Sequence, residues 1–158
     1  METPIFKKLQ NDPRIKEAKK LLLEAVKDHQ SKLKKPKNPT QNLKKKSDKI
    51  IKRLNKGRGG NLRYPYIASG LGNGALVQLE DGSIKYDLIN GIGVHPGHSD
   101  LDIIESSINA ALEDTVMQGN LQQNKTSEEI ISILTKQSGM AHCFLTTSGA
   151  MAAENALK

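Results

Sequence analysis

The chain has 158 residues, a formal net charge of +7 and only five aromatic residues, three Tyr and two Phe. Its mean hydropathy of −0.53 leaves a thin supply of apolar side chains for a self-contained core. The single cysteine, Cys143, excludes an intramolecular disulfide, which fits a reducing compartment. No apolar run approaches the roughly 20 residues of a membrane span, and the opening METPIFKKLQ lacks the apolar stretch of a secretory signal. We therefore expect a cytoplasmic protein without a membrane segment.

The charge is divided unevenly along the chain. Residues 1–60 hold 19 Lys and Arg against 6 acidic residues, whereas residues 61–158 hold 5 against 11. Net charges of +13 and −6 indicate that two different segments are joined. We divide the chain into a basic helical extension at 1–58, a hairpin and glycine-rich segment at 59–99, and an α/β segment at 100–158.

Two helices are predicted in the basic extension. Asp12 is a suitable N-cap and Pro13 suits the first helical position, and apolar residues then recur at three- and four-residue steps to about Lys35. Residues 34–42 (KKPKNPTQN) hold two prolines and no apolar residue, which predicts a linker. A second basic helix is predicted from about Leu43 to Asn55, before the sequence GRGG.

The basic extension has two interpretations. Clustered Lys and Arg are typical of a nucleic-acid-binding arm, because they release counterions from phosphates. However, no aromatic residues are interleaved with these charges to stack on bases, and no known reading motif is present. We prefer the second interpretation, a solvated helical extension lying on a larger protein, since charge runs are usually solvated.

The segment after GRGG is predicted to be extended. Residues 75–89 (ALVQLEDGSIKYDLI) place β-forming residues on both sides of the turn EDGS, where Gly82 supplies the positive φ of a tight hairpin turn. In the glycine-rich loop that follows, His95 and His98 are three residues apart and suggest a metal pair. No third ligand is placed, so we interpret them as organising the loop and predict no metal site.

The last third of the chain is predicted to continue as an α/β layer. Residues 99–117 and 126–138 each open with a capping-box spacing, Ser-x-x-Asp and Thr-x-x-Glu, and Gly139 closes the second helix. The apolar run at 140–146 predicts a buried parallel strand, which needs neighbouring strands and covering helices. A helix start follows it, so the order indicates an α/β layer entered partway through.

The stretch TTSGAMAAENALK, residues 146–158, turns through Ser-Gly-Ala into a helix. The first backbone N–H groups of such a helix point outward, and with the helix dipole they form a ready anion site. By spacing alone, Ser148 and Gly149 are more often an ordinary N-cap. A nucleophilic role for Ser148 is weaker still, because the G-x-S-x-G elbow is missing and no histidine is marked as its base.

The sequences GNGALVQLEDGSIKYDLINGIGV, then GH, then TTSGAMAAENALK occur in the order found in one enzyme family. From about residue 60 onward the chain resembles the first third of class III aminotransferases, the pyridoxal-phosphate enzymes that act on acetylornithine, ornithine and 4-aminobutyrate. The resemblance implies the type I fold of these transferases, with residues 100–158 beginning its large cofactor-binding domain. It also implies that Ser148, Gly149 and Ala150 bind the phosphate of pyridoxal 5'-phosphate and that Ile92 faces the substrate.

The chain departs from the family pattern in two places. Asp100 and Leu101 stand where the family usually has His-Pro, so the geometry of the preceding loop does not follow from the resemblance. Met151 and Ala153 stand where Glu and often Asn occur in the phosphate loop. Backbone N–H donors do not depend on those two side chains. The two replacements therefore affect phosphate binding less than they affect the contacts that the replaced side chains would make.

The resemblance places the Schiff-base lysine beyond the phosphate loop, so this chain holds no catalytic residue and Lys158 only ends a helix. We therefore expect a truncated product, a split half or a fragment that is inactive alone. In the complete enzyme we expect a homodimer, an amine or amino-acid donor and a 2-oxo acid acceptor, with nucleic acid not expected as a partner. The alternative function is a non-enzymatic nucleic-acid-binding protein that uses residues 13–58 and carries a degenerate enzyme remnant.

Overall fold

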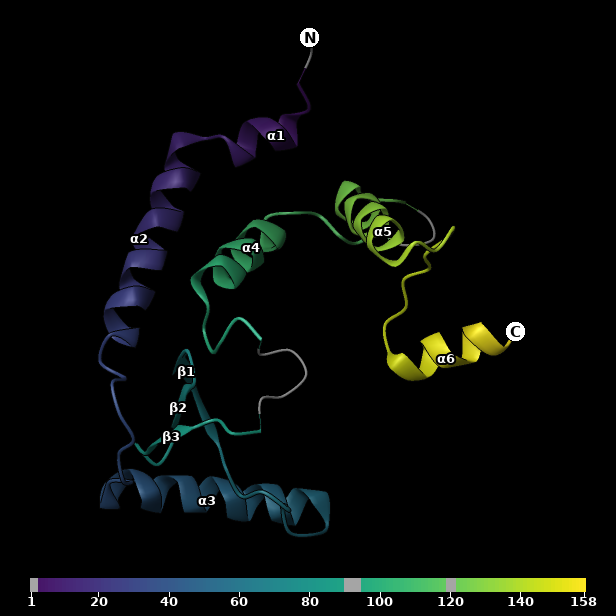
Figure 1. Cartoon of the computed structure of the whole chain (residues 1–158). Coiled ribbons are helices and arrows are strands. Elements are labelled where there is room, and N and C mark those ends of the chain that lie inside the picture. Colours follow the sequence, from purple (N-terminus) through teal and green to yellow (C-terminus); the bar gives the residue numbers. More distant parts are fainter. Residues whose placement is uncertain (1–2, 90–94, 119–121) are drawn as a thin grey trace. The chain divides into compact units, whose positions relative to one another are not determined.

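The computed structural model describes residues 3–89, 95–118 and 122–158, and these fold as a mixed α/β structure (Figure 1). The described residues form six helices and one sheet of three antiparallel strands. The helices are α1 (Ile5–Gln10), α2 (Pro13–Gln30), α3 (Gln41–Arg58), α4 (Leu101–Ala111), α5 (Lys125–Ser138) and α6 (Gly149–Leu157). The strands are β1 (Ala68–Asn73), β2 (Leu76–Leu79) and β3 (Ile84–Tyr86).

The chain divides into two compact units, Met1–Glu113 and Asp114–Lys158. The first unit contains the sheet with α1 to α4, and the second contains α5 and α6. Helix α4 thus belongs to the first unit, although the sequence analysis grouped its residues with the segment 100–158. The family-based domain boundaries stay predictions.

Helix α2 begins as the sequence predicted but ends earlier. Asp12 caps it by accepting a hydrogen bond from the backbone N–H of Arg14, and Pro13 occupies the first turn. The predicted end near Lys35 is wrong, because the helix stops at Gln30 and the chain turns so that Leu33 enters the core, where it is 4% exposed. Burying Leu33 stabilises the fold more than another exposed helical turn would.

The predicted linker at 34–42 is attached to the hairpin by backbone hydrogen bonds. Lys37 and Ile84 exchange two N–H to O bonds of 3.0 Å each, and Thr40 N donates to Asp81 O at 3.0 Å. Helix α3 therefore starts at a fixed point beside the hairpin. It runs from Gln41 to Arg58, longer than predicted at both ends, and Gly59 closes it at a φ of 71°.

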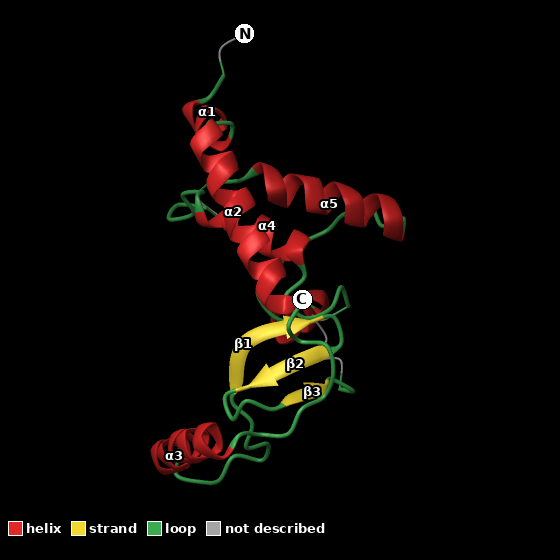
Figure 2. Cartoon of the chain, turned by 90° about the vertical axis from the view of Figure 1, so that its left-hand side faces the viewer, coloured by secondary structure: helices red, strands yellow, loops and turns green. Residues whose placement is uncertain are grey.

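The predicted hairpin is confirmed (Figure 2). β2 and β3 pair antiparallel with Val77 opposite Lys85, and Gly82 in the turn has a φ of 79°. Asp81 Oδ1 accepts hydrogen bonds from both the backbone N–H and the hydroxyl of Ser83. β1 adds to the other edge of β2 and was not predicted, because its sequence ASGLGN has little β propensity.

The core is small and lies where α2 meets the sheet. Leu33, Leu76 and Ile84 form its buried cluster, and Leu79 is also buried. Gln30 Nε2 donates to the carbonyl oxygens of Gly72 and Ser99, which connects the end of α2 to β1 and to the start of α4. Because a buried amide must find partners, this residue fixes the relative positions of three segments.

The helix after the glycine-rich loop is confirmed, but its predicted ends are wrong. The N-cap of α4 is Asp100, whose side chain accepts from the N–H groups of Asp102 and Ile103. Ser99 instead has a φ of 52° and accepts from Gly72 N with its hydroxyl oxygen. The helix ends at Ala111, not near residue 117, since Asp114 accepts from Val116 N in a local turn that competes with helix.

In the second unit, α5 ends at Gly139 with a φ of 71°, as predicted. Its N-cap is Asn124, which accepts from Ser127 N, so the predicted start at Thr126 is slightly late. The strand predicted at 140–146 is wrong: these residues form no strand, and Phe144 is 75% exposed. A strand needs a neighbour for its backbone groups, and no described residue of this unit supplies one.

Candidate functional site

The turn before α6 has the form expected of a helix-terminal anion site. Ser148 is extended, with φ of −155° and ψ of 155°, and its side-chain oxygen accepts from Met151 N at 3.2 Å. Thr146 Oγ1 donates to Ser148 O at 3.0 Å, which holds the chain in the bend. Thr147 Oγ1 donates to Met151 Sδ at 3.1 Å. These local bonds position the first turn of α6 without help from distant residues.

The donors at this end of α6 are open. Among the described residues, neither the Gly149 nor the Ala150 amide has an acceptor, and no atom lies within 4 Å of where a Cβ on Gly149 would stand. Two amides and the positive end of the helix dipole are therefore available to bind an anion. A phosphate group fits this arrangement, because it can approach the backbone closely at glycine.

The structure brings three of the four predicted site residues together. Ser148, Gly149 and Ala150 lie on consecutive positions of one turn. Ile92, the predicted substrate-facing residue, lies outside the described residues. Lys158 ends α6, where it forms an ion pair of 3.0 Å with Glu154 one turn earlier.

A second polar cluster connects the hairpin to the glycine-rich loop. His98 Nε2 lies 2.8 Å from Asp87 Oδ2, and both side chains are partly buried. His98 N donates to Gly74 O at 2.8 Å. His98 therefore has the loop-organising contacts that the sequence analysis expected. Its partner Asp87 was not singled out from sequence, because a single acidic residue after a strand carries no specific signal.

His95 lines a cavity of about 410 Å³ beside this pair, together with Gly74, Ala75 and Pro96. Within the described ranges, no group of three or more His, Cys, Asp or Glu side chains is arranged to bind a metal ion. In the described part of the chain, His95 and His98 therefore contribute polar side chains to the wall of this cavity.

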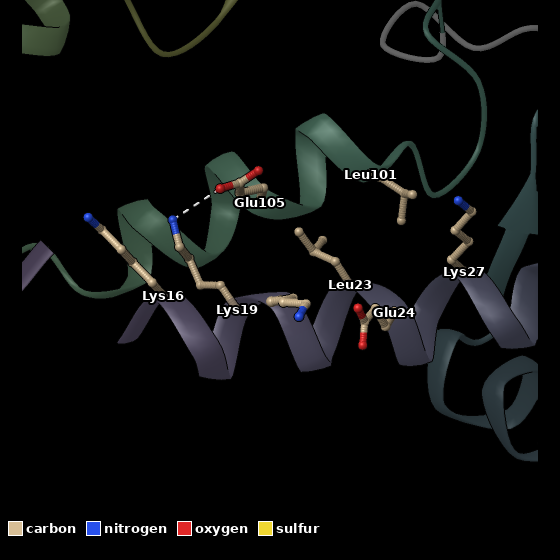
Figure 3. Close-up of a pocket in the computed structure, with 8 residues that line it drawn as sticks. Lys16, Lys19, Leu23, Glu24, Lys27, Leu101 and Glu105 are labelled. Carbon is tan, nitrogen blue, oxygen red and sulfur yellow. Dashed lines mark hydrogen bonds and ion pairs between the residues drawn. The ribbon is translucent and has the colours of Figure 1, made fainter. Parts of the chain in front are cut away.

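A groove of about 500 Å³ lies between α2 and α4 (Figure 3). Lys19 Nζ donates to Glu105 Oε1 at 3.0 Å and to Asn109 Oδ1 at 2.9 Å, and Leu23 and Leu101 also line the groove. The two bonded partners lie far from Lys19 in sequence, so no local pattern predicted this contact. Its evident role is to hold α4 against the basic extension.

Comparisons of the chain with protein-family models, with curated proteins and with solved structures gave no match. Among the described residues, no helix combines the length and the apolar character needed to cross a membrane.

Proposed function

We propose that this sequence carries the N-terminal part of a class III pyridoxal-phosphate-dependent aminotransferase with the type I fold. The observation that supports this most is the first turn of α6, where Ser148 caps the helix and the amides of Gly149 and Ala150 are open. This turn follows the hairpin and the helices α4 and α5, and its motif stands in the order on which the resemblance to the family rests.

The proposed role of this chain is to bind and orient the cofactor. When bound, pyridoxal phosphate supplies the electron sink for moving an amino group from an amine or amino acid to a 2-oxo acid. The Gly149 and Ala150 amides would bind the phosphate, supported by the helix dipole. Ser148 uses its oxygen to accept from Met151 N, so its O–H proton is left for a phosphate oxygen.

The remaining features of the proposal follow from the family. The lysine that holds the cofactor covalently would come from sequence after the phosphate turn, so we expect these 158 residues alone to lack transaminase activity. The complete enzyme would be a cytoplasmic homodimer. Borohydride reduction of the chain with pyridoxal phosphate, followed by peptide mass mapping, should find no single stoichiometric lysine adduct; such an adduct together with turnover contradicts the expectation.

The phosphate turn is tested by comparing Gly149→Val with Met151→Glu in the full-length gene product. Gly149 does not have a positive φ, so valine there acts by adding a branched side chain where the phosphate would approach the backbone. Met151 lies further into the helix, where its N–H already bonds Ser148. We expect Gly149→Val to weaken the binding of pyridoxal phosphate far more than Met151→Glu.

Titration of each variant with pyridoxal phosphate and with pyridoxal, which lacks the phosphate, provides the measurement. If the turn holds the phosphate, Gly149→Val lowers the affinity for pyridoxal phosphate and leaves that for pyridoxal nearly unchanged. Equal affinity of Gly149→Val and the parent for pyridoxal phosphate would show that the phosphate binds elsewhere.

A further inference from the structure

Most of the basic residues of helix α3 lie on one face, and its apolar residues lie outside that face. With 3.6 residues per turn, six basic side chains fall within about 120° of arc centred on Lys49. They are Lys45, Lys46, Lys49, Lys52, Arg53 and Lys56, and they are called the basic face below. Ser47 lies about 160° around the helix from Lys49 and is 5% exposed, so the opposite side is the one turned toward the protein.

The basic face is exposed and electrostatically unsatisfied. All six of its side chains are exposed. The helix holds eight basic residues and one acidic residue, Asp48, which pairs with Lys44 outside the basic face. Within the part of the chain that the structure describes, none of the six has an ion-pair partner. Their mutual repulsion is thus relieved only by solvent ions.

The attachment of α3 leaves this face free. Thr40 N donates to Asp81 O at the start of the helix, and Leu43 Cδ1 lies 2.9 Å from the position that a Cβ on Gly82 would take. At the other end, Asn55 Oδ1 accepts from Leu62 N. Each contact comes from the side of the helix away from Lys49, so a partner can reach the basic face without displacing the protein.

We propose that the basic face of α3 binds the phosphate backbone of a nucleic-acid duplex without reading its sequence. The helix is about 27 Å long, so its basic face can lie along a duplex and contact several phosphates of the backbone. A duplex carries one negative charge per roughly 1.7 Å of its axis, so the row of basic side chains on this face can pair with a row of phosphates. The face has no side chain suited to base stacking, and phosphate contacts alone give no sequence preference.

A membrane surface fits this helix less well. Helices that lie in a membrane interface insert a broad apolar face, whereas on the side of α3 away from the basic face Ser47 is buried and Leu43 contacts the hairpin turn at Gly82. The proposal does not depend on the aminotransferase function, because it uses residues that the phosphate turn of α6 does not involve. The charge separation favours it over the solvated extension that charge runs usually form.

The test is a salt titration of duplex binding by the full chain, measured by the anisotropy of a labelled random-sequence DNA duplex. Six neutralised phosphates give a slope of about −5 for log Kobs against log salt concentration. Combining Lys45→Gln, Lys49→Gln, Lys52→Gln and Lys56→Gln should reduce the slope by roughly 4, since each phosphate-contacting Lys contributes about 1. Glutamine has a helix propensity close to that of lysine, so α3 should persist, and circular dichroism checks this.

The control combines Lys7→Gln, Lys8→Gln, Lys16→Gln and Lys20→Gln, which removes the same charge from exposed positions on α1 and α2. We expect it to keep most of the slope. An equal loss in both variants would show diffuse attraction by net charge and overturn the proposal. Absence of duplex binding at low salt would also overturn the proposal. A parallel titration with phosphatidylserine vesicles gives one further test. If the basic face is needed for binding to the vesicles but not for binding to the duplex, the proposal is wrong.

Discussion

Replacing Gly72 with alanine should strongly destabilise the first unit. A Cβ on Gly72 would lie 2.3 Å from His98 Cβ and 2.9 Å from the backbone oxygen of Leu76. Neither atom is the end of a flexible side chain, so the backbone of the loop or of the strand must move. That movement would strain the bond from Gly72 N to Ser99 Oγ and the bond from Gln30 Nε2 to Gly72 O.

The magnitude follows from these contacts. Overpacking of a closely packed site costs about 1–3 kcal/mol, and each weakened hydrogen bond contributes about 1 kcal/mol. We therefore expect Gly72→Ala to lower the free energy of unfolding by about 3 kcal/mol. This is a large share of the stability available to a unit in which, among the described residues, Leu33, Leu76 and Ile84 form the core cluster.

Gly57→Ala is the matched control. Gly57 lies in the last turn of α3, where no atom lies within 4 Å of the position of its Cβ. Alanine is favoured over glycine in a helix interior by about 1 kcal/mol, and this is the upper limit for the gain at Gly57. The same substitution should thus stabilise at one glycine and destabilise at the other. Urea unfolding followed by circular dichroism measures both; an unchanged midpoint for Gly72→Ala, at an unchanged slope, would refute the reasoning.

Two further predictions concern a titrating group and the second unit. The pKa of Asp12 is lowered from 3.8 to about 2, first by the hydrogen bonds from the Arg14 side chain and then by that from Arg14 N. The stabilisation of α2 by this carboxylate is therefore present above pH 3.8 and lost as pH falls through 2. An NMR titration of the carboxyl group should show the low pKa of Asp12, and Arg14→Ala should raise that pKa. Met140 and Phe144 are 67% and 75% exposed, so we expect the 158-residue chain to self-associate. A monodisperse monomer in analytical ultracentrifugation, together with cooperative thermal unfolding, would contradict this.

The sequence by itself determined the features that depend on a few neighbouring residues. The hairpin follows from its Asp-Gly turn and its β-forming flanks, and Gly139 ends α5 because glycine adopts a positive φ at no steric cost. Ser148 caps α6 for a similarly local reason, since its hydroxyl reaches an N–H group three residues later. The candidate phosphate turn could therefore be located from sequence, whereas the predicted substrate-facing residue, Ile92, lies outside the described residues.

Only the tertiary structure decided the features that depend on residues far apart in the chain. β1 forms despite the glycines in its sequence, because the edge of β2 supplies partners for its backbone hydrogen bonds. Residues 140–146 include β-forming side chains, but no described strand lies beside them. Helix α2 stops at Gln30 because the turn after it places the side chain of Leu33 in the core, away from water. Lys19 donates a hydrogen bond to Glu105 because α4 packs against α2. A pattern within one segment specifies what that segment favours; whether its backbone groups and apolar side chains find partners is decided by the segments that fold against it.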